Sequence, residues 1–393
     1  MAEQLKRRIG PGLLTAYGVG IMVGAGIYVL VGIAAGEAGV WAPVSFLLAG
    51  LVAVPTALAF SELSARIPEA AGDSAYVELG LNLHWLAVVV GVINITAGTV
   101  AAAVVLRGGV GYLTSIAPVR FEYAVIGLGV GLTILAIIGV LESLAFAALL
   151  TLVEVVGLCM VIWVGFGAEP VADWTNMPAI EWPGVLAASI FAFFAFIGFD
   201  DMVNMAEEAR EPARNMPRAI LLALAITAAL YALVSMAAVR TVPVELLGKS
   251  EQPLALVWET ATGSSAVFLS AIAVAAALNG VLAQIVMASR VLFGLGRRSP
   301  RLAIFHRAHP RFGTPFLASA IIGAVVIAAA MTLPVATLAE YTTLALLIVF
   351  IIVNSALIGL KRKGGKTPFD VPVWVPWLGI LGCAGMFAAY FAG

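Results

Sequence analysis

The sequence is a succession of long apolar stretches separated by short charged segments. A helix that crosses a bilayer needs ~20 consecutive apolar residues, and 62% of the 393 residues are hydrophobic while 11% are charged. This composition lies outside the range of soluble proteins. It predicts an all-α integral membrane protein, with residues 1–393 as a single polytopic domain. We expect eleven spans, at roughly 13–36, 40–60, 85–106, 123–141, 143–168, 184–206, 219–240, 260–290, 314–333, 335–360 and 372–392.

Basic residues indicate how these spans are oriented. If the N-terminus is cytoplasmic, only four of the 21 lysines and arginines fall on the outer side, namely Arg107, Arg120, Arg240 and Lys249. Cytoplasmic loops carry the excess of Lys and Arg, so the sequence predicts a cytoplasmic N-terminus and an outside C-terminus in the cell (cytoplasmic) membrane. No early apolar run has the length and cleavage site of a signal peptide, and the first span is expected to remain in the mature protein.

The first span contains a cluster of glycines in the stretch YGVGIMVGAGIY, residues 17–28. A glycine inside a helix costs ~1 kcal/mol relative to alanine, and an unpaired backbone group in hydrocarbon is more costly still. The stretch is therefore expected either to break the helix beside a protein-walled cavity or to allow close helix packing. Gly20-x-x-x-Gly24 and Gly32-x-x-x-Gly36 match the small-residue packing motif, so this segment alone leaves both interpretations open.

A second interruption favours the broken-helix interpretation. In SIFAFFAFIGFDDMVNMAEEAREP, residues 189–212, an apolar helical run meets Ile197-Gly198-Phe199 and then the adjacent carboxylates Asp200 and Asp201. The two interruptions fall in the first and sixth spans. These are corresponding positions in a transporter that is built from two inverted five-helix repeats.

The breaks themselves supply groups that can bind a small zwitterion. Where the helix resumes after Gly26, its free N–H groups and the positive end of its dipole can receive a carboxylate. Carbonyl oxygens near Met22, and near Phe194 and Ile197 in the second break, can receive an ammonium group. The sequence thus predicts a small-molecule substrate, an amino acid or a related amine.

Three motifs carry a family resemblance: Gly20-Ile-Met-Val-Gly-Ala-Gly-Ile27, Phe194-Ala-Phe-Ile-Gly-Phe-Asp200 and Ala206-Glu-Glu-Ala-Arg-Glu-Pro212. Together they resemble the amino acid-polyamine-organocation (APC) family of permeases, and weaker matches extend the resemblance over nearly the whole chain. It implies a 5+5 inverted-repeat transporter core with discontinuous helices 1 and 6. The first repeat would lie within 1–168, the second within 184–360, and an eleventh transmembrane helix at 372–392.

The resemblance also implies how the site works. Alternating access would expose a site between spans 1, 3, 6, 8 and 10. There the amides of Gly24, Ala25 and Gly26 would hold the substrate carboxylate, and carbonyls near Met22, Phe194 and Ile197 would hold the amine. Phe194 matches the gating aromatic of the family, and Phe199 is a second gating candidate.

Two departures from the family pattern bear on this site. Many members have serine where Ala25 stands, so a hydroxyl donor to the carboxylate is missing here. The usual Gly-Gly-x-Tyr after span 2 is replaced by Ala71-Gly72-Asp73-Ser74. The sequence also stops after span 11 where twelve spans are common, which leaves the oligomeric state open.

Two acidic residues in predicted spans are candidates for ion or proton coupling. Glu154 lies near the middle of span 5, where a charge costs ~2.5–3.5 kcal/mol. It is either the carboxylate whose protonation is coupled to transport or a permanently neutral acid bonded to the backbone of span 1. We favour coupling, because burial favours the protonated form of a carboxyl. Asp200 is the second candidate, and its alternative role is to cap the helix that resumes after the break.

Nothing in the sequence indicates an enzyme. It contains no His-Glu-x-x-His, Cys-x-x-Cys or Gly-x-Ser-x-Gly pattern, and we expect no metal site and no cofactor. Basic loops such as residues 296–312 are explained by topology and acidic lipid head groups, so no nucleic acid partner is expected.

The sequence therefore predicts a secondary transporter in the lipid bilayer, coupled to protons. The phenylalanines at the second break favour neutral, apolar amino acids. Cationic amino acids and polyamines stay as alternatives, because Asp200 or Glu154 could pair with a cationic group. An amino acid or polyamine exchanger is the alternative mechanism, and a channel is the alternative from another class.

Overall fold

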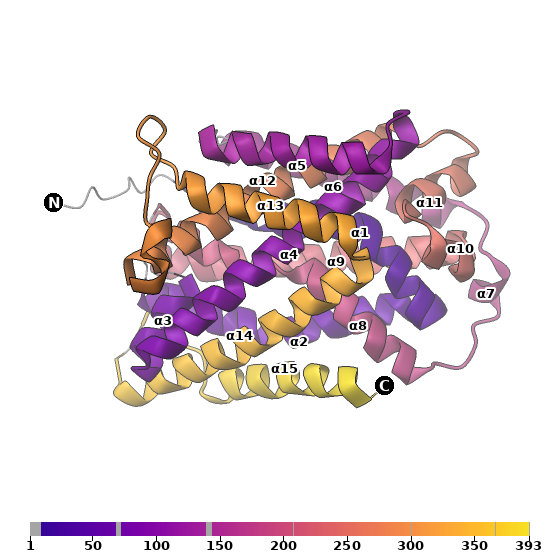
Figure 1. The fold of residues 1–393 in the computed structure, drawn as a ribbon. Helices are drawn as coiled ribbons and strands as arrows, with labels where there is room; N and C mark the ends of the chain where they lie inside the picture. The colour runs from indigo at the N-terminus through magenta and orange to yellow at the C-terminus, as the bar shows by residue number, and fades with distance from the viewer. Residues whose placement is uncertain are drawn as a thin grey trace.

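The computed structural model describes residues 9–67, 72–138, 144–206, 208–298, 300–365 and 367–392. Over these residues the chain forms a bundle of helices without a β-strand (Figure 1). The α-helices are α1 (Pro11–Ala38), α2 (Ala42–Arg66), α3 (Gly72–Leu81), α4 (His84–Ile116), α5 (Phe121–Ile138), α6 (Leu144–Gly167), α7 (Ala172–Thr175), α8 (Trp182–Phe196), α9 (Pro212–Thr241), α10 (Val244–Lys249), α11 (Pro253–Thr262), α12 (Val267–Arg298), α13 (Phe316–Thr332), α14 (Val335–Lys363) and α15 (Trp374–Ala392). Short 3-10 helices are η1 (Gly39–Trp41), η2 (Asp201–Met205) and η3 (Pro300–Phe305).

Within the described ranges, nine helical stretches are long and apolar enough to cross a membrane. A helix also overlaps each of the eleven predicted spans. The counts differ because α13 is a shorter apolar helix, and because Gly26–Arg66 joins the second part of α1 to α2 in one stretch. The chain is thus a multi-pass helical membrane protein, while eleven separate crossings stay a prediction.

Proline and glycine set several helix ends. Pro212 begins α9 and Pro253 begins α11, where a residue without an N–H loses no helical hydrogen bond. Gly263, with φ of 68°, follows the end of α11, and α12 begins only at Val267. The eighth span, predicted to start at residue 260, therefore starts seven residues later, because the turn at Gly263 separates α11 from α12.

The outer surface of the bundle is apolar. On α5 the exposed side chains include Tyr123, Ile126, Val130 and Ile134, which recur every three or four residues and so share one helix face. Trp163 of α6 is 82% exposed. Apolar surface this extensive has to be covered, and the hydrocarbon of a bilayer is the environment that suits it.

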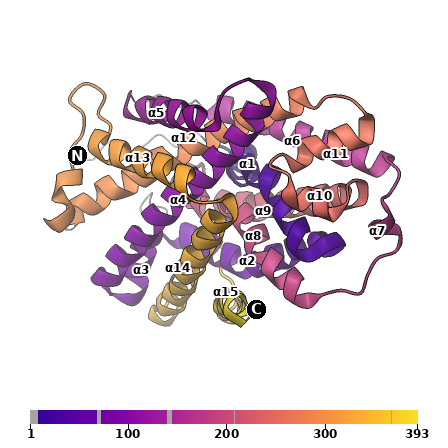
Figure 2. The same ribbon diagram turned by 45° about the vertical axis from the view of Figure 1, so that its right-hand side comes forward.

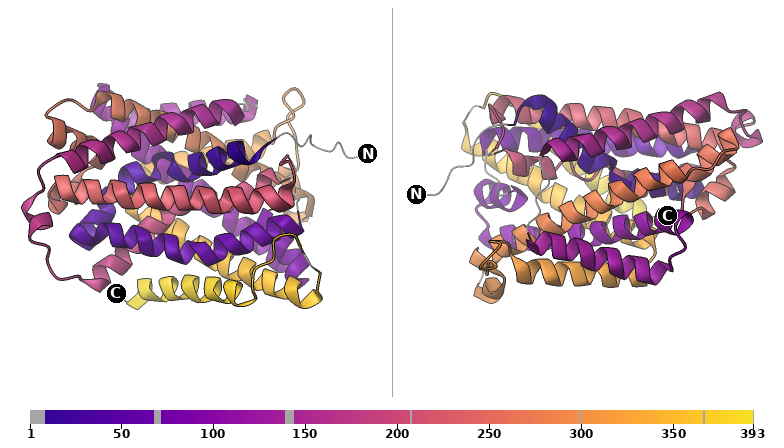
Figure 3. Two further views of the ribbon diagram at one scale, coloured as in Figure 1. Left: turned by 180° about the vertical axis from the view of Figure 1, so that it is seen from behind. Right: turned by 90° about the horizontal axis from the view of Figure 1, so that it is seen from above.

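The bundle has two end faces, which we call the N-terminal face and the opposite face. α1 begins at the N-terminal face (Figure 3), and α3 lies at the same end of the bundle, whereas α7, α10 and α11 gather at the opposite face (Figures 1 and 2). There α10 packs directly on α1. A Cβ added to Gly36 would lie 3.2 Å from the Cα of Gly248, and one added to Gly32 would lie 2.6 Å from the Leu247 carbonyl oxygen. Close packing thus explains this pair of glycines.

A buried carboxylate ties helices together at the N-terminal face. Glu62 of α2 is fully buried. Its Oε1 accepts a hydrogen bond from Arg66 Nε at 2.7 Å and lies 2.7 Å from Lys361 Nζ of α14. Its Oε2 accepts from the amide of Val371, just before α15, at 2.8 Å. A buried carboxylate with this many donors is well satisfied, and it joins α2, α14 and α15.

The middle of the bundle brings the two interrupted helices together. Seen from behind, α9 lies between α2 and α6 (Figure 3), and it packs against both of them. α1 packs against α8 and α9. The interruptions of α1 and α8 are therefore neighbours in the interior of the protein.

Candidate functional site

α1 leaves the helical conformation at a single residue, Gly24, where φ is −11° and ψ is −173°. A Cβ added to Gly24 would meet no atom within 4 Å, so there is open space beside this break. Ala25 and Gly26 follow in the second part of the helix, and the side chain of Ala25 lies outside the described part of the chain. The break thus offers backbone groups next to unfilled space.

Gly18 and Gly20, which precede the break, have a different role. A side chain at Gly18 would run into Met202 of η2, and one at Gly20 would run into Thr151 of α6. Glycine allows the close approach at both positions. The two interpretations of this segment therefore apply to different residues: Gly24 breaks the helix, whereas Gly18 and Gly20 allow packing.

The second break is longer than the first. α8 ends at Phe196, Ile197 is extended with φ of −59° and ψ of 135°, and Gly198 has φ of 125°. The sequence predicts that a helix resumes after this break, but the chain continues as the five-residue 3-10 helix η2. Glu211, with φ of 45°, lies directly before α9. The segment between the break and α9 is therefore too short for a longer helix.

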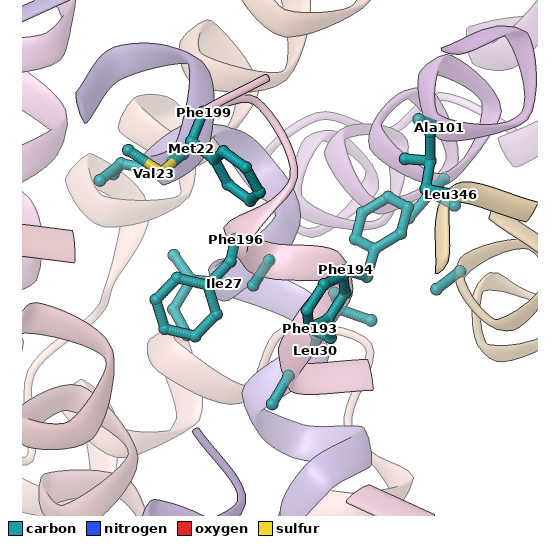
Figure 4. Packing of buried hydrophobic residues seen from close by; sticks show 14 of the residues in the cluster. Met22, Val23, Ile27, Leu30, Ala101, Phe193, Phe194, Phe196, Phe199 and Leu346 are labelled. Carbon is teal, nitrogen blue, oxygen red and sulfur yellow. The ribbon is translucent and has the colours of Figure 1, made fainter. Parts of the chain in front are cut away.

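The two breaks lie against each other. A Cβ at Gly198 would run into the side chain of Ile21, and one at Gly26 would lie 3.7 Å from Phe194 Cε1. Figure 4 shows Met22 beside Phe199, and Ile27 beside Phe196. The predicted substrate-binding segments around Met22–Gly26 and Phe194–Ile197 are thus brought into one region.

Several carbonyl oxygens at the breaks already have hydrogen-bond partners. The amide of Ile197 donates to the Phe194 carbonyl at 3.1 Å. The hydroxyl of Tyr231, on α9, donates to the Met22 carbonyl at 2.5 Å and also lies 3.0 Å from the Ala195 carbonyl oxygen. A carbonyl oxygen has two lone pairs, so each can accept one further hydrogen bond.

The two predicted gating aromatics have different surroundings. Phe194 is 5% exposed, and its ring points toward Ala101 of α4 and Leu346 of α14 (Figure 4). Phe199 is fully buried, with its ring centroid 5.3 Å from that of Phe350 and 5.9 Å from that of Phe60. Phe194 is therefore the aromatic beside the first break, while Phe199 belongs to a packed aromatic cluster.

Glu154 lies on α6, close to both α1 and α9. Its side chain is 2% exposed, and its Oε2 has no hydrogen-bond partner among the described residues. The hydroxyl of Tyr28 donates to the main-chain carbonyl of Glu154 at 3.3 Å. Glu154 is thus next to the part of α1 that follows the first break, and one of its carboxyl oxygens has no partner in the described chain.

The two aspartates after the second break point in different directions. Asp200 Oδ1 accepts a hydrogen bond from the amide of Gly198 at 3.0 Å, which stabilises the break itself. Asp201 Oδ2 accepts from Gln284 Nε2 of α12 at 3.4 Å. Within the described chain, no group of three acidic, histidine or cysteine side chains is arranged to hold a metal ion.

A third aspartate lies near this pair. Asp73, at the start of α3, accepts a hydrogen bond from Asn94 Nδ2 of α4 at 2.6 Å. Burial raises the pKa of Asp73 to about 7, the charge of Asp200 acts in the same direction, and the Asn94 hydrogen bond opposes both. The residue stands in the segment that departs from the family pattern after the second span.

Comparison with known proteins identifies the family of this chain. The sequence model described as amino acid permease matches residues 13–393. The chain belongs to the amino acid permease family. This permease is 30% identical over 387 residues to an uncharacterized transporter of Mycobacterium tuberculosis, over 97% of this chain and 86% of that protein.

Two further relatives have named substrates. The methylthioribose transporter of Bacillus subtilis is 29% identical over 404 residues, and the branched-chain amino acid permease BcaP of the same organism is 27% identical over 412 residues. Each comparison covers 97% of this permease and 87% of the relative. The family resemblance and the transporter class are confirmed, and this permease is a multi-pass membrane transporter rather than an enzyme.

Sequence reasoning missed three residues of the site region of this permease: Tyr231, Gln284 and Asp73. A tyrosine in an apolar span needs a partner for its hydroxyl, so Tyr231 in the predicted span 219–240 carried a usable signal. Gln284 carried the same kind of signal in span 8. Asp73 stood out only as part of a departure from the family pattern, because its neighbours Asn94 and Asp200 are distant in the sequence.

Proposed function

We propose that this permease is a secondary transporter that carries small neutral amino acids or related small solutes across the cytoplasmic membrane by alternating access. The observation that carries the proposal is the meeting of two helix breaks inside the bundle, with open space beside Gly24. Broken helices of this kind hold substrates in membrane transporters. The name of the branched-chain amino acid permease favours neutral amino acids as substrates. Because another relative is named a methylthioribose transporter, other small solutes are also tested as substrates.

The architecture that we propose is two inverted repeats of five helices, within 1–168 and 184–360, with residues 372–392 as an additional helix. The breaks in α1 and after α8 support it, because these helices are the first and sixth of the predicted spans. The N-terminal face is the cytoplasmic face in this proposal, because most lysines and arginines fall on that side of the predicted spans.

In the proposed binding mode, the substrate carboxylate lies on the amides of Gly24, Ala25 and Gly26. The second part of α1 begins there, so its dipole and free amides favour an anion. The amino group lies on carbonyls near Met22, Phe194 and Ile197, which keep lone pairs for it. Phe194 is the gate beside Gly26, and Phe199 is a second gating residue.

Proton coupling is assigned to Glu154, with Asp200 as the second coupling residue. Glu154 is buried and has an oxygen without a partner in the described chain, so it can take up a proton without breaking a hydrogen bond. Asp200 is bonded to the backbone of the second break, so its protonation would act on the break directly. Exchange of one substrate for another is the alternative mode.

Uptake by the purified permease in lipid vesicles tests this function. Branched-chain amino acids and methylthioribose are offered to vesicles with and without a pH gradient. We expect saturable uptake, counterflow, and accumulation that is driven by the gradient. Counterflow without any response to the gradient would indicate an exchanger, and an unsaturable conductance would indicate a channel.

The variant Glu154→Gln tests the coupling residue. The amide cannot ionise, so we expect substrate binding and counterflow to persist while accumulation driven by the pH gradient is lost. Glu340→Gln is the matched control, because Glu340 lies on α14, far along the chain from both breaks. Undiminished pH-driven accumulation in Glu154→Gln would remove Glu154 from the coupling mechanism.

A further inference from the structure

Tyr231 contacts the backbone of both interrupted helices. Its side chain is fully buried in α9. Its hydroxyl contacts the carbonyl oxygens of Met22 in α1 and Ala195 in α8, at 2.5 Å and 3.0 Å. One side chain from a third helix therefore contacts both broken helices at their last turns before the breaks.

A tyrosine hydroxyl has a single hydrogen to donate. The two carbonyl oxygens must share it in a three-centre hydrogen bond, with the shorter arm to Met22. Both carbonyls therefore depend on the same hydrogen, and the distance between the two breaks is tied to the position of the Tyr231 hydroxyl.

The ring of Tyr231 is held by aromatic neighbours. Its centroid lies 5.2 Å from that of Phe196 and 5.9 Å from that of Phe46, in edge-to-face arrangements. These contacts fix the ring whether or not it carries a hydroxyl. The hydroxyl can thus be removed as phenylalanine while the packing is kept.

Two hydroxyls on the same helix provide controls. Thr227 and Ser235 lie one turn before and one turn after Tyr231, and both are fully buried. Their side-chain oxygens have no hydrogen-bond partner among the residues that the structure describes. Like Tyr231, they are buried residues of α9, but their hydroxyls contact neither break.

We propose that Tyr231 is a positioning residue of the binding site, which sets the spacing of the two helix breaks and thereby the carbonyls that receive the amino group of the substrate. This rests on the proposed function. The carboxylate end of the substrate depends on the amides after Gly24 and does not require Tyr231. Loss of the hydroxyl should therefore weaken recognition of the amine and leave recognition of the carboxylate intact.

The test compares leucine with 4-methylpentanoate, which is leucine without its amino group. Binding of both to the purified permease is measured for the wild type, Tyr231→Phe, Thr227→Val and Ser235→Ala. We expect the preference for leucine to fall about tenfold in Tyr231→Phe, because hydrogen bonds to a charged group are strong. We expect 4-methylpentanoate to bind as before, and both controls to keep the wild-type preference.

Several outcomes would overturn the inference. If Tyr231→Phe keeps the wild-type preference for leucine, the hydroxyl does not position the amine site. If both ligands weaken equally and the unfolding temperature drops, Tyr231 has only a structural role. If the Tyr231→Phe protein cannot be produced in folded form, Tyr231→Met is measured instead, because the flexible methionine side chain fills the space without a hydrogen-bond donor. A wild type without any preference for leucine would overturn the proposed amine recognition, and this inference with it.

Discussion

The break in α1 and the break after α8 both interrupt a helix inside the bundle, but they differ in length and in their surroundings. The first occupies one residue, Gly24, has open space beside it, and is followed at once by helix. The second runs from Ile197 into a 3-10 helix and contains a glycine with φ of 125°. Neither break carries a basic side chain, but the second is followed directly by Asp200 and Asp201.

The difference separates two tasks. Around the second break, the side chains of Asp200 and Asp201 are bonded to Gly198 and Gln284, so the backbone there is fixed by the protein itself. Around the first break, no atom lies within 4 Å of an added Cβ at Gly24. The first break is thus the one with room for a ligand, and the second is the one that the fold must hold in shape.

The largest effect is expected for Gly198→Ala. A side chain there would adopt a strained backbone conformation and run into Ile21, at a combined cost of ~2–5 kcal/mol. We expect little folded protein in the membrane and a lower unfolding temperature for what remains. Gly127→Ala on α5, where an added Cβ meets no atom, is the control. A stable, active Gly198→Ala would break the distinction between the two breaks.

Gly24→Ala should separate function from stability. The added methyl group enters the open space beside the first break, so we expect folded protein at near wild-type levels but uptake reduced at least about tenfold, as for a misplaced group in a binding site. Vesicle uptake and an unfolding temperature on the same preparation check both parts. Normal uptake would mean that this space is not used by the substrate.

The pH dependence of stability should come from the acidic residues near the second break. The pKa of Asp73, raised to about 7 by burial, lies above its usual value of 3.8. Its neutral form therefore stabilises the protein at low pH, and this stabilisation, on the order of a few kcal/mol, is lost as the pH rises from about 4 through 7. Unfolding temperatures over this range should fall less for Asp73→Asn than for the wild type. Parallel curves would contradict this assignment.

The smallest effect is expected for the stability of Asp200→Asn. The amide oxygen can still accept the hydrogen bond of the Gly198 amide, so the unfolding free energy should change by less than about 0.5 kcal/mol. Asp200→Ala, which loses that acceptor, should cost ~1 kcal/mol. Accumulation driven by a pH gradient is measured in the same proteins, and we expect it to be reduced a few-fold in Asp200→Asn. Unchanged accumulation would leave Asp200 with a capping role alone.

The sequence alone was sufficient for the membrane class, the family and the position of both breaks. These rest on local properties: the length of apolar runs, the cost of glycine in a helix, and the adjacent carboxylates Asp200 and Asp201. The segment boundaries were less secure, as at the eighth span, because a single turn at Gly263 shifted the start of α12.

Only the tertiary structure decided which backbone groups at the breaks have partners. Met22, Ala195 and Tyr231 lie in three different helices, and no spacing in the sequence predicts that one hydroxyl would contact both carbonyls. The same holds for Gly18 and Gly20, whose need for close packing depends on Met202 and Thr151. Helix and break are set by neighbouring residues along the chain, whereas the partners of a buried polar group are set by the packing of distant helices.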